Sequence, residues 1–175
     1  QTGSKMISVI SQPVIYTRDT AVCPGSTVRL TDLVYAVDGT DVYFYSDAAG
    51  QNPVNPPYDF VINADVTFWA QLKNSTNLCR SQLKPIAIIM NPAPVVSTID
   101  IQVCQNDITN LYDAVTFYTP STTFEFYRGQ YGTVRILNPE SFAAKSSTTE
   151  CYVKAINPTT GCESRLAHFN VIPFN

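Results

Sequence analysis

The chain has 175 residues, a formal net charge of −3 at pH 7 and only 14% charged side chains. Its eleven Lys and Arg residues are spread singly and form no basic stripe, so the sequence argues against a nucleic-acid partner. No apolar run approaches the roughly 18 residues of a membrane-spanning helix, so we expect a chain that does not span a membrane. Many Val, Ile, Thr, Tyr and Phe residues and twelve prolines favour strands and turns over helices.

The first half of the chain predicts a series of short strands separated by turns. Residues 1–6 have the character of a tail, and 8–16 suit an edge strand because they include Pro13. Turn signals at Pro24-Gly25 and Asp38-Gly39 and a loop over 50–57 separate the strands that follow. The expected strands are 27–30, 42–46, 66–73 and 85–90. Two prolines in 91–94 then predict a stiff linker.

The second half follows the same plan. Strands are expected from 95–96, over 123–127, 150–156 and 167–172, with one helical turn near Pro139. Matching positions lie 81 residues apart at Cys23 and Cys104, 82 at Phe44 and Phe126, and 83 at Cys79 and Cys162. The offset between matching residues changes by single residues, and only between the expected strands, as loop insertions in a duplicated module would produce. We therefore predict an all-β chain of two tandem antiparallel β-sandwiches, over residues 1–94 and 95–175.

Five cysteines include two pairs with the same spacing. In small strand-rich modules such pairs indicate disulfides formed in an oxidising compartment, and we expect one in each module, Cys23–Cys79 and Cys104–Cys162. Reduced thiols are the alternative. Zinc is disfavoured because the members of each pair lie more than fifty residues apart, and we expect no metal. The chain begins with Gln1, which fits a secreted protein whose signal peptide has been removed, or a trimmed chain.

Aligning the two long strands assigns their faces. Alternate residues of each strand form two sets, and the set that includes the charged side chains is expected to point outwards. Trp69 and its match Tyr152 belong to this outward set, whereas Phe68 and its match Cys151 are expected to point into the core. We therefore interpret the fifth cysteine as a small buried side chain. A catalytic thiol would need His168, the one histidine, beside it. With no other catalytic motif, we predict that the chain is not an enzyme and needs no cofactor.

The outward set predicts an exposed aromatic patch. If the 42–46 and 66–73 strands are neighbours, their outward rings lie together and could stack on a sugar or seat a protein. The alternative is that a loop, the N-terminal segment or another domain covers them. The candidate residues are Tyr43, Tyr45 and Trp69 in the first module and Tyr127 and Tyr152 in the second. Asp38, Asp41 and Asp47 lie in turns and could bind calcium through their carboxylates, but no spaced motif supports such a site, and solvated turns are the favoured interpretation.

Three stretches resemble a known family. These are residues 22–31, the aromatic strand 43–45 and the ending 157–164. They are similar to immunoglobulin-like repeats of large secreted surface proteins of Bacteroidota, including gliding and adhesion proteins exported by type IX secretion. The sequence Cys104-Gln105-Asn106-Asp107 departs from the Pro-Gly or Glu-Gly that usually follows this cysteine.

This resemblance implies an extracellular or cell-surface address and a spacer or adhesion role within a larger surface protein or among neighbouring adhesin domains. The outward aromatics keep a second function open, a carbohydrate-binding accessory module with polysaccharide as ligand. The resemblance also implies that Thr20, in Asp19-Thr20-Ala21, is a candidate for O-linked glycosylation.

Overall fold

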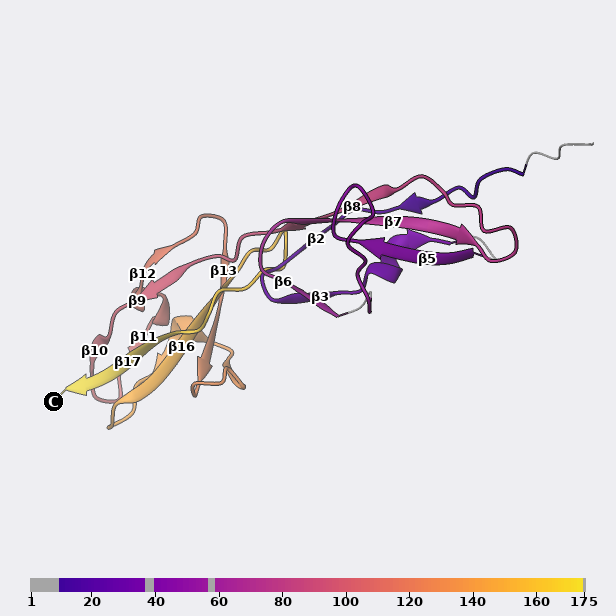
Figure 1. Ribbon diagram of the computed structural model, residues 1–175. Helices are drawn as coiled ribbons and strands as arrows, with labels where there is room; N and C mark the ends of the chain where they lie inside the picture. The colour runs from indigo at the N-terminus through magenta and orange to yellow at the C-terminus, as the bar shows by residue number, and fades with distance from the viewer. Residues whose placement is uncertain (1–9, 37–39, 57–58, 175) are drawn as a thin grey trace, which may run out of the picture. The chain divides into compact units, whose positions relative to one another are not determined.

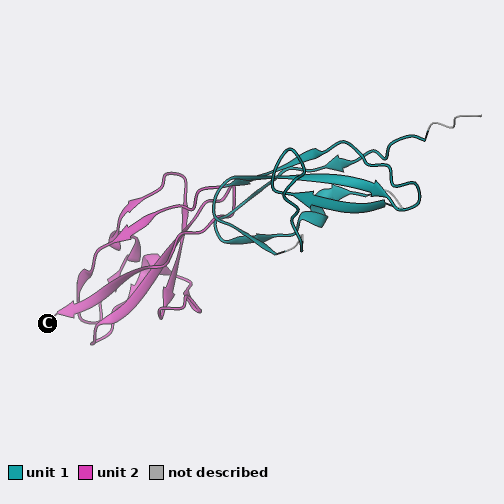
Figure 2. Ribbon diagram, viewed as in Figure 1, with its two compact units in different colours: residues 1–90 teal, residues 91–175 magenta. Residues whose placement is uncertain are grey.

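The computed structural model describes residues 10–36, 40–56 and 59–174, and the expected tail at 1–6 and the turn at Asp38-Gly39 lie outside them. The chain divides into two compact units, residues 1–90 and 91–175 (Figures 1 and 2). The four residues expected as a linker therefore begin unit 2. Each unit consists of strands and short 3-10 turns, with its own hydrophobic core.

The main sheet of unit 1 has four strands in the order β2-β8-β7-β5. They are β2 (Thr20–Val22), β8 (Lys84–Met90), β7 (Val66–Asn74) and β5 (Thr40–Tyr45). The opposing layer is made of two short pairs, β1 (Tyr16–Thr17) with β4 (Val34–Tyr35) and β3 (Ser26–Val28) with β6 (Phe60–Ile62). The order β8-β7-β5 is the G-F-C order of immunoglobulin-like sandwiches.

Unit 2 repeats this plan with one added strand. Its main sheet runs β10 (Ile101–Cys104), β17 (Ala167–Phe174), β16 (Thr149–Ile156), β13 (Thr123–Arg128) and β14 (Val134–Ile136). The other layer pairs β9 (Val96–Thr98) with β12 (Val115–Tyr118) and β11 (Ile108–Thr109) with β15 (Phe142–Ala143). The expected helical turn is present as the 3-10 turn η3 (Pro139–Ser141).

One pair of strands in each main sheet is parallel. β2 runs parallel to β8, and β10 runs parallel to β17, whereas the prediction was of wholly antiparallel sandwiches. The edge strands β2 and β10 do not form a hairpin with the strand that they pair with, and this sets their direction. Their direction also decides at which end of the sheet the nearby cysteine lies: Cys23, directly after β2, or Cys104, the last residue of β10.

The cores follow the predicted parity. Phe44, Phe68 and Leu72 are buried in unit 1, and Phe126, Cys151 and Phe169 are buried in unit 2. The repeated leucine lies not on a strand but in a 3-10 turn, η1 (Leu30–Leu33) or η2 (Leu111–Ala114), where it is fully buried. The expected strand over 27–30 therefore ends at Val28. Packing of that leucine overrides the local strand preference.

Neither predicted intramodule disulfide is present. Cys23 and Cys162 are the disulfide-bonded cysteines, whereas Cys79, Cys104 and Cys151 are free. Val22, next to Cys23, pairs with Met90, beside the start of β7, but Cys79 O accepts a hydrogen bond from Asn74 at the end of β7. At about 3.3 Å per residue the nine residues of β7 span on the order of 25 Å, far beyond the roughly 4.4–6.8 Å between Cα atoms of a disulfide.

The same geometry separates the second predicted pair. Cys104 pairs with Phe174, beyond the start of β16, and Cys162 O accepts from Asn157, just after β16 ends. Both predicted pairings were therefore wrong because each joined opposite ends of one sandwich. The cysteine spacing correctly marked the duplication but not the connectivity.

Candidate functional site

The predicted aromatic patch lies on one face of the main sheet of unit 1. β5 and β7 are neighbours, as the patch requires, with Tyr45 opposite Trp69 and Tyr43 opposite Gln71. The next strand, β8, places Pro85 opposite Trp69. The three aromatic side chains therefore lie on adjacent strands, on the face opposite the core residue Phe44.

Arg80 covers much of this face. Its Nη1 donates hydrogen bonds to Gln71 Oε1 over 3.0 Å and to Tyr45 Oη over 3.4 Å, and its guanidinium carbon lies 5.8 Å from the Tyr43 ring centre. Tyr45 is only 7% exposed, while Tyr43 is 38% exposed and Trp69 is half-buried. The loop after β7 therefore covers part of the aromatic patch. This agrees with the alternative in which a loop, and not a ligand, covers these side chains.

Unit 2 has a matching cluster with different charges. Tyr127 is 8% exposed, its hydroxyl donates to Glu125 Oε2 over 2.5 Å, and Lys154 Nζ lies 5.5 Å from its ring centre. Burial, followed by the bond to Glu125, raises the pKa of Tyr127. Lys154 also donates to Glu163 Oε2 over 2.8 Å, and this bond raises the pKa of Lys154.

The two clusters therefore differ in chemistry. Arg80 and Glu163 follow their loop cysteines directly, so one position carries opposite charges in the two units. The Tyr152 ring lies 5.0 Å from the His168 ring, at the position where Trp69 and Pro85 are paired across the strands of unit 1. A cation lies over a tyrosine ring in both clusters, but the acidic side chain of Glu163 stands in unit 2 where Arg80 stands in unit 1. Binding at these five aromatic residues stays a prediction.

Cys151 points into the core, as predicted. It is fully buried, and burial raises the pKa of its thiol to about 11. Its partner across the sheet is Phe169, while the adjacent His168 pairs with Tyr152 and is exposed. Neighbouring residues of a strand point to opposite faces, so the thiol and the imidazole lie on different sides of the sheet. This arrangement cannot activate Cys151 as a nucleophile.

Asp19 has a structural role next to Thr20. Its Oδ1 accepts a hydrogen bond from the Ala87 N–H over 2.8 Å, and Asp100 Oδ1 accepts from the Asn170 N–H over 2.7 Å in unit 2. These carboxylates attach the first strand to the last strand of each sheet. Thr20 is half-buried and pairs with Ile88, and its glycosylation stays a prediction.

The acidic turn beside β5 is closed by its own backbone. Asp47 accepts hydrogen bonds from the N–H groups of Ala49, Gln51 and Asn52, the last over 2.6 Å. These bonds, that from Asn52 first, lower the pKa of Asp47. Asp38 lies outside the described residues. Within the described ranges, no three His, Cys, Asp or Glu side chains are grouped to hold a metal ion.

The loop that carries Cys79 is built like the loop that carries Cys162, a similarity that the sequence prediction missed. Asn74 Oδ1 accepts the N–H of Thr76, and Asn157 Oδ1 accepts the N–H of Thr159, each over 2.9 Å. The signal was visible as the spacing Asn-x-Thr-x-x-Cys-x-Ser, which occurs at 74–81 and at 157–164. The two matching serines, Ser81 and Ser164, each accept a backbone N–H of the preceding long strand over 2.9 Å.

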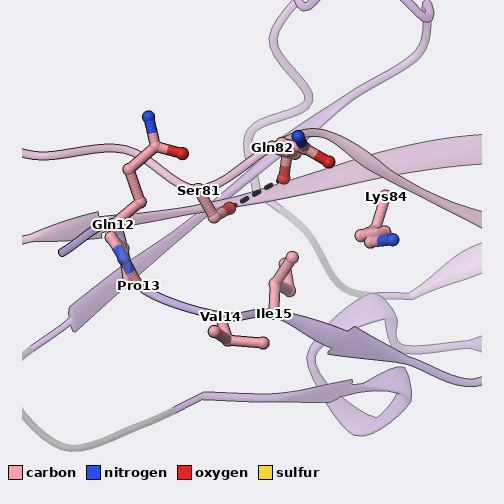
Figure 3. A pocket seen from close by; sticks show the side chains of 7 residues that line it. All are labelled: Gln12, Pro13, Val14, Ile15, Ser81, Gln82 and Lys84. Atoms are coloured by element: carbon pink, nitrogen blue, oxygen red, sulfur yellow. Dashed lines mark hydrogen bonds between the residues drawn. The ribbon is translucent and has the colours of Figure 1, made fainter.

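A groove lies beside this loop in each unit. Figure 3 shows the one in unit 1, where Pro13, Val14 and Ile15 lie along one side and the bonded pair Ser81 and Gln82 along the other. The groove in unit 2 is lined by the matching positions: Ala93, Pro94, Val95, Val96, Ser164, Arg165, Leu166 and Ala167. Its recurrence indicates a feature of the module's architecture.

Comparison with known proteins finds no matching family model and no matching curated protein. The solved structures that match include the N-terminal Ig1-2 module of the Drosophila receptor protein tyrosine phosphatase DLAR, at 10% identity over 92% of this chain and 99% of that one, with a TM-score of 0.32. Domains EC1-2 of human mucin-like protocadherin match at 8% identity over 92% and 99%, with a TM-score of 0.31. Immunoglobulin domains 1-4 of Sidekick-1 match at 11% identity over 94% and 47%, with a TM-score of 0.30.

These neighbours are tandem immunoglobulin-like and cadherin-like modules, but the likeness is too low to carry a functional argument. The strand order of each unit is the basis for calling it an immunoglobulin-like sandwich. In the part of the chain that the structure describes, no helix is long and apolar enough to cross a bilayer.

Proposed function

We propose that this chain is a non-enzymatic extracellular module of a bacterial surface protein, acting as a spacer or adhesion element through protein–protein contacts. The observation that carries the proposal is the disulfide-bonded state of Cys23 and Cys162, because structural disulfides form in oxidising compartments. The tandem sandwich architecture suits a spacer, and the buried Cys151 thiol supports a role without nucleophilic chemistry. The bacterial address rests on the resemblance described above.

Two measurements on the source cells test this proposal. The first is labelling of intact cells with a membrane-impermeant, amine-reactive biotin reagent, which we expect to modify the chain as strongly as a known surface protein. The second is an in-frame deletion of residues 10–174 from the encoding gene, which we expect to reduce attachment or gliding. Protection of the chain until the cells are lysed would contradict the location, and unchanged attachment would contradict the role.

A further inference from the structure

The main sheet of unit 2 ends at the edge strand β14. This strand pairs with β13 on one side, and among the residues that the structure describes no strand pairs with its other side. Two large apolar side chains are exposed along it, Val134 at 57% and Leu137 at 81%. The backbone N–H and C=O groups on the open side are therefore available to an extended segment of another chain.

A cavity opens beside this edge. Its volume is about 360 Å³, within the range of ligand-binding pockets. It is lined by the end of β13, by β14 and the residues after it, and by Ser141 and the strand β15 of the other layer. Its polar lining residues are Arg128, Arg135, Asn138 and Ser141, and none of the described residues that line it is acidic. The cavity therefore favours a negatively charged ligand.

Arg128 is the cation that faces this cavity. It is the last residue of β13 and shares the parity of the core residue Phe126, so its side chain points to the inner side of the sheet. Its guanidinium carbon lies 5.2 Å from the ring centre of the buried Phe142 in β15. The structure shows no ion pair between Arg128 and any residue that it describes. The ring thus orients a guanidinium whose N–H groups remain able to bind a carboxylate.

Arg135, the other cation of the lining, is already paired. It lies opposite Tyr127, and its Nη2 is 3.0 Å from Glu125 Oε1. Its charge is therefore balanced within unit 2. Arg135 also argues against a second copy of this chain as the partner, because an antiparallel pair of β14 strands centred on it would place two arginines opposite each other.

Unit 1 does not repeat this arrangement. The position that matches Arg128, 82 residues earlier, is Ser46. Beside the edge strand β5, Pro53 forms a bridge with Tyr45, and Pro56 follows in the same loop. Proline has no N–H to donate to an added strand. The open edge with its cation is thus a feature of unit 2 that duplication of the module does not explain.

We propose that β14 binds an extended acidic segment of a partner protein, which adds a strand to the sheet and places a carboxylate against Arg128. Backbone hydrogen bonds to β14 hold the segment, and Val134 and Leu137 supply apolar contact. Arg128, with Asn138 and Ser141 beside it, selects the carboxylate. This inference rests on the protein–protein role of the proposed function and names the class of partner.

Purified chain and synthetic peptides test the proposal. One peptide, blocked at both ends, has seven residues of alternating Val and Thr with Glu at its centre, and a second carries Gln in place of Glu. We expect the Glu peptide to bind roughly tenfold more tightly, because a charge-assisted hydrogen bond contributes about that factor. NMR titration measures both affinities and should show amide shifts at residues 134–138, with none in unit 1.

Methylated peptides test the added strand. Two further Glu peptides are each N-methylated at one of the two alternate sets of backbone nitrogens. Successive N–H groups of a strand point to opposite sides, so the methyl groups of one peptide face β14 and those of the other face solvent. We expect the first to lose binding and the second to retain it. Equal binding of both would overturn strand addition.

Variants of the chain test the cation. Arg128→Gln should lower the affinity for the Glu peptide to that for the Gln peptide. Arg128→Lys should keep part of the preference, because it retains the charge without the planar guanidinium, and it serves as the second variant if Arg128→Gln does not fold. Arg165→Gln removes an exposed arginine elsewhere in unit 2 and should keep the full preference.

Three other results would overturn the proposal. They are equal binding of the Glu and Gln peptides, an equal loss of preference in Arg165→Gln, and amide shifts away from β14. Binding of oligogalacturonate at Arg128 without binding of the Glu peptide would also overturn it and would indicate an acidic polysaccharide as the ligand. Since these measurements use purified chain, their failure is distinguishable from failure of the surface-labelling and deletion experiments.

Discussion

Cys79 and Cys162 occupy equivalent positions in two loops with the same hydrogen bonds, yet only Cys162 is disulfide-bonded. The difference therefore does not arise within the loops. Within unit 2, Cys162 Sγ also lies 3.9 Å from the carbonyl oxygen of Asn91, the first residue of that unit.

Reduction of the disulfide-bonded cysteines Cys23 and Cys162 should leave both sandwiches folded. The two hydrophobic cores are built from separate sets of residues, all within their own unit. We expect unchanged far-UV circular dichroism in dithiothreitol, and urea unfolding of the reduced protein that matches the variant Cys23→Ser/Cys162→Ser. A bridge within one module would stabilise that module by roughly 4 kcal/mol. A loss of stability of that size on reduction would contradict this expectation.

The substitution Leu78→Gly should stabilise unit 1. Leu78 has a φ of 63°, an unfavourable conformation for a residue with a Cβ, and its counterpart in unit 2 is Gly161 at 72°. We expect a gain of up to about 1 kcal/mol in the free energy of unfolding, since relief of strain is partly offset by a more flexible unfolded chain. Urea titration measures the change.

The matched control for this prediction is Gly161→Ala. The added Cβ would meet nothing within 4 Å, so any cost comes from the backbone conformation alone. We expect a loss of roughly 1 kcal/mol in unit 2. A destabilising Leu78→Gly or a neutral Gly161→Ala would show that these loops do not depend on the positive φ.

Ser81→Ala should destabilise unit 1. Ser81 is 5% exposed, accepts the Leu72 N–H over 2.9 Å and donates to the Gln82 carbonyl over 2.8 Å. Removing the hydroxyl leaves the buried Leu72 N–H without its partner, at a cost of roughly 1–3 kcal/mol. Ser164→Ala, at the less buried counterpart, should cost less because water can replace the hydroxyl. Thermal unfolding of both variants measures the two losses of stability. Equal losses for Ser81→Ala and Ser164→Ala would contradict the argument from burial.

Cys151 should resist alkylation in the folded protein. Its thiol is buried with a pKa of about 11, so iodoacetamide at pH 8 should modify Cys79 and Cys104 first, and Cys151 only after unfolding. Burial disfavours the thiolate, so the stability that depends on the neutral thiol is present below pH 9 and is lost between pH 9 and about 11. The variant Cys151→Ala should not show this loss of stability between pH 9 and about 11. Rapid native labelling of Cys151 would reject the assignment.

The Asp47 turn should weaken in acid. Backbone N–H groups hold the pKa of this carboxyl below its usual value of 3.8. A lowered pKa in the folded state stabilises the protein above pH 3.8, and that contribution disappears as the pH falls through the folded-state value. Comparing wild type with Asp47→Ala between pH 7 and pH 2 should show a stability difference that shrinks in acid. A difference independent of pH would contradict the role of the carboxylate.

The sequence by itself determined the duplication, the positions of the long strands and the parity of their side chains. The inward direction of Phe68 and Cys151 follows from the two-residue period of a strand, which is a local property of the chain. Local chemistry likewise placed the turn at Pro139. Such features need no knowledge of which strands meet.

Only the tertiary structure decided which cysteines bond and which aromatic side chains are covered. The parallel entry of β2 beside β8 places Cys23 and Cys79 at opposite ends of unit 1, and no local pattern encodes the direction of an edge strand. Arg80 covers Tyr45 because the loop after β7 returns along the sheet. Both outcomes depend on contacts between residues far apart in the sequence, and spacing alone does not fix these contacts.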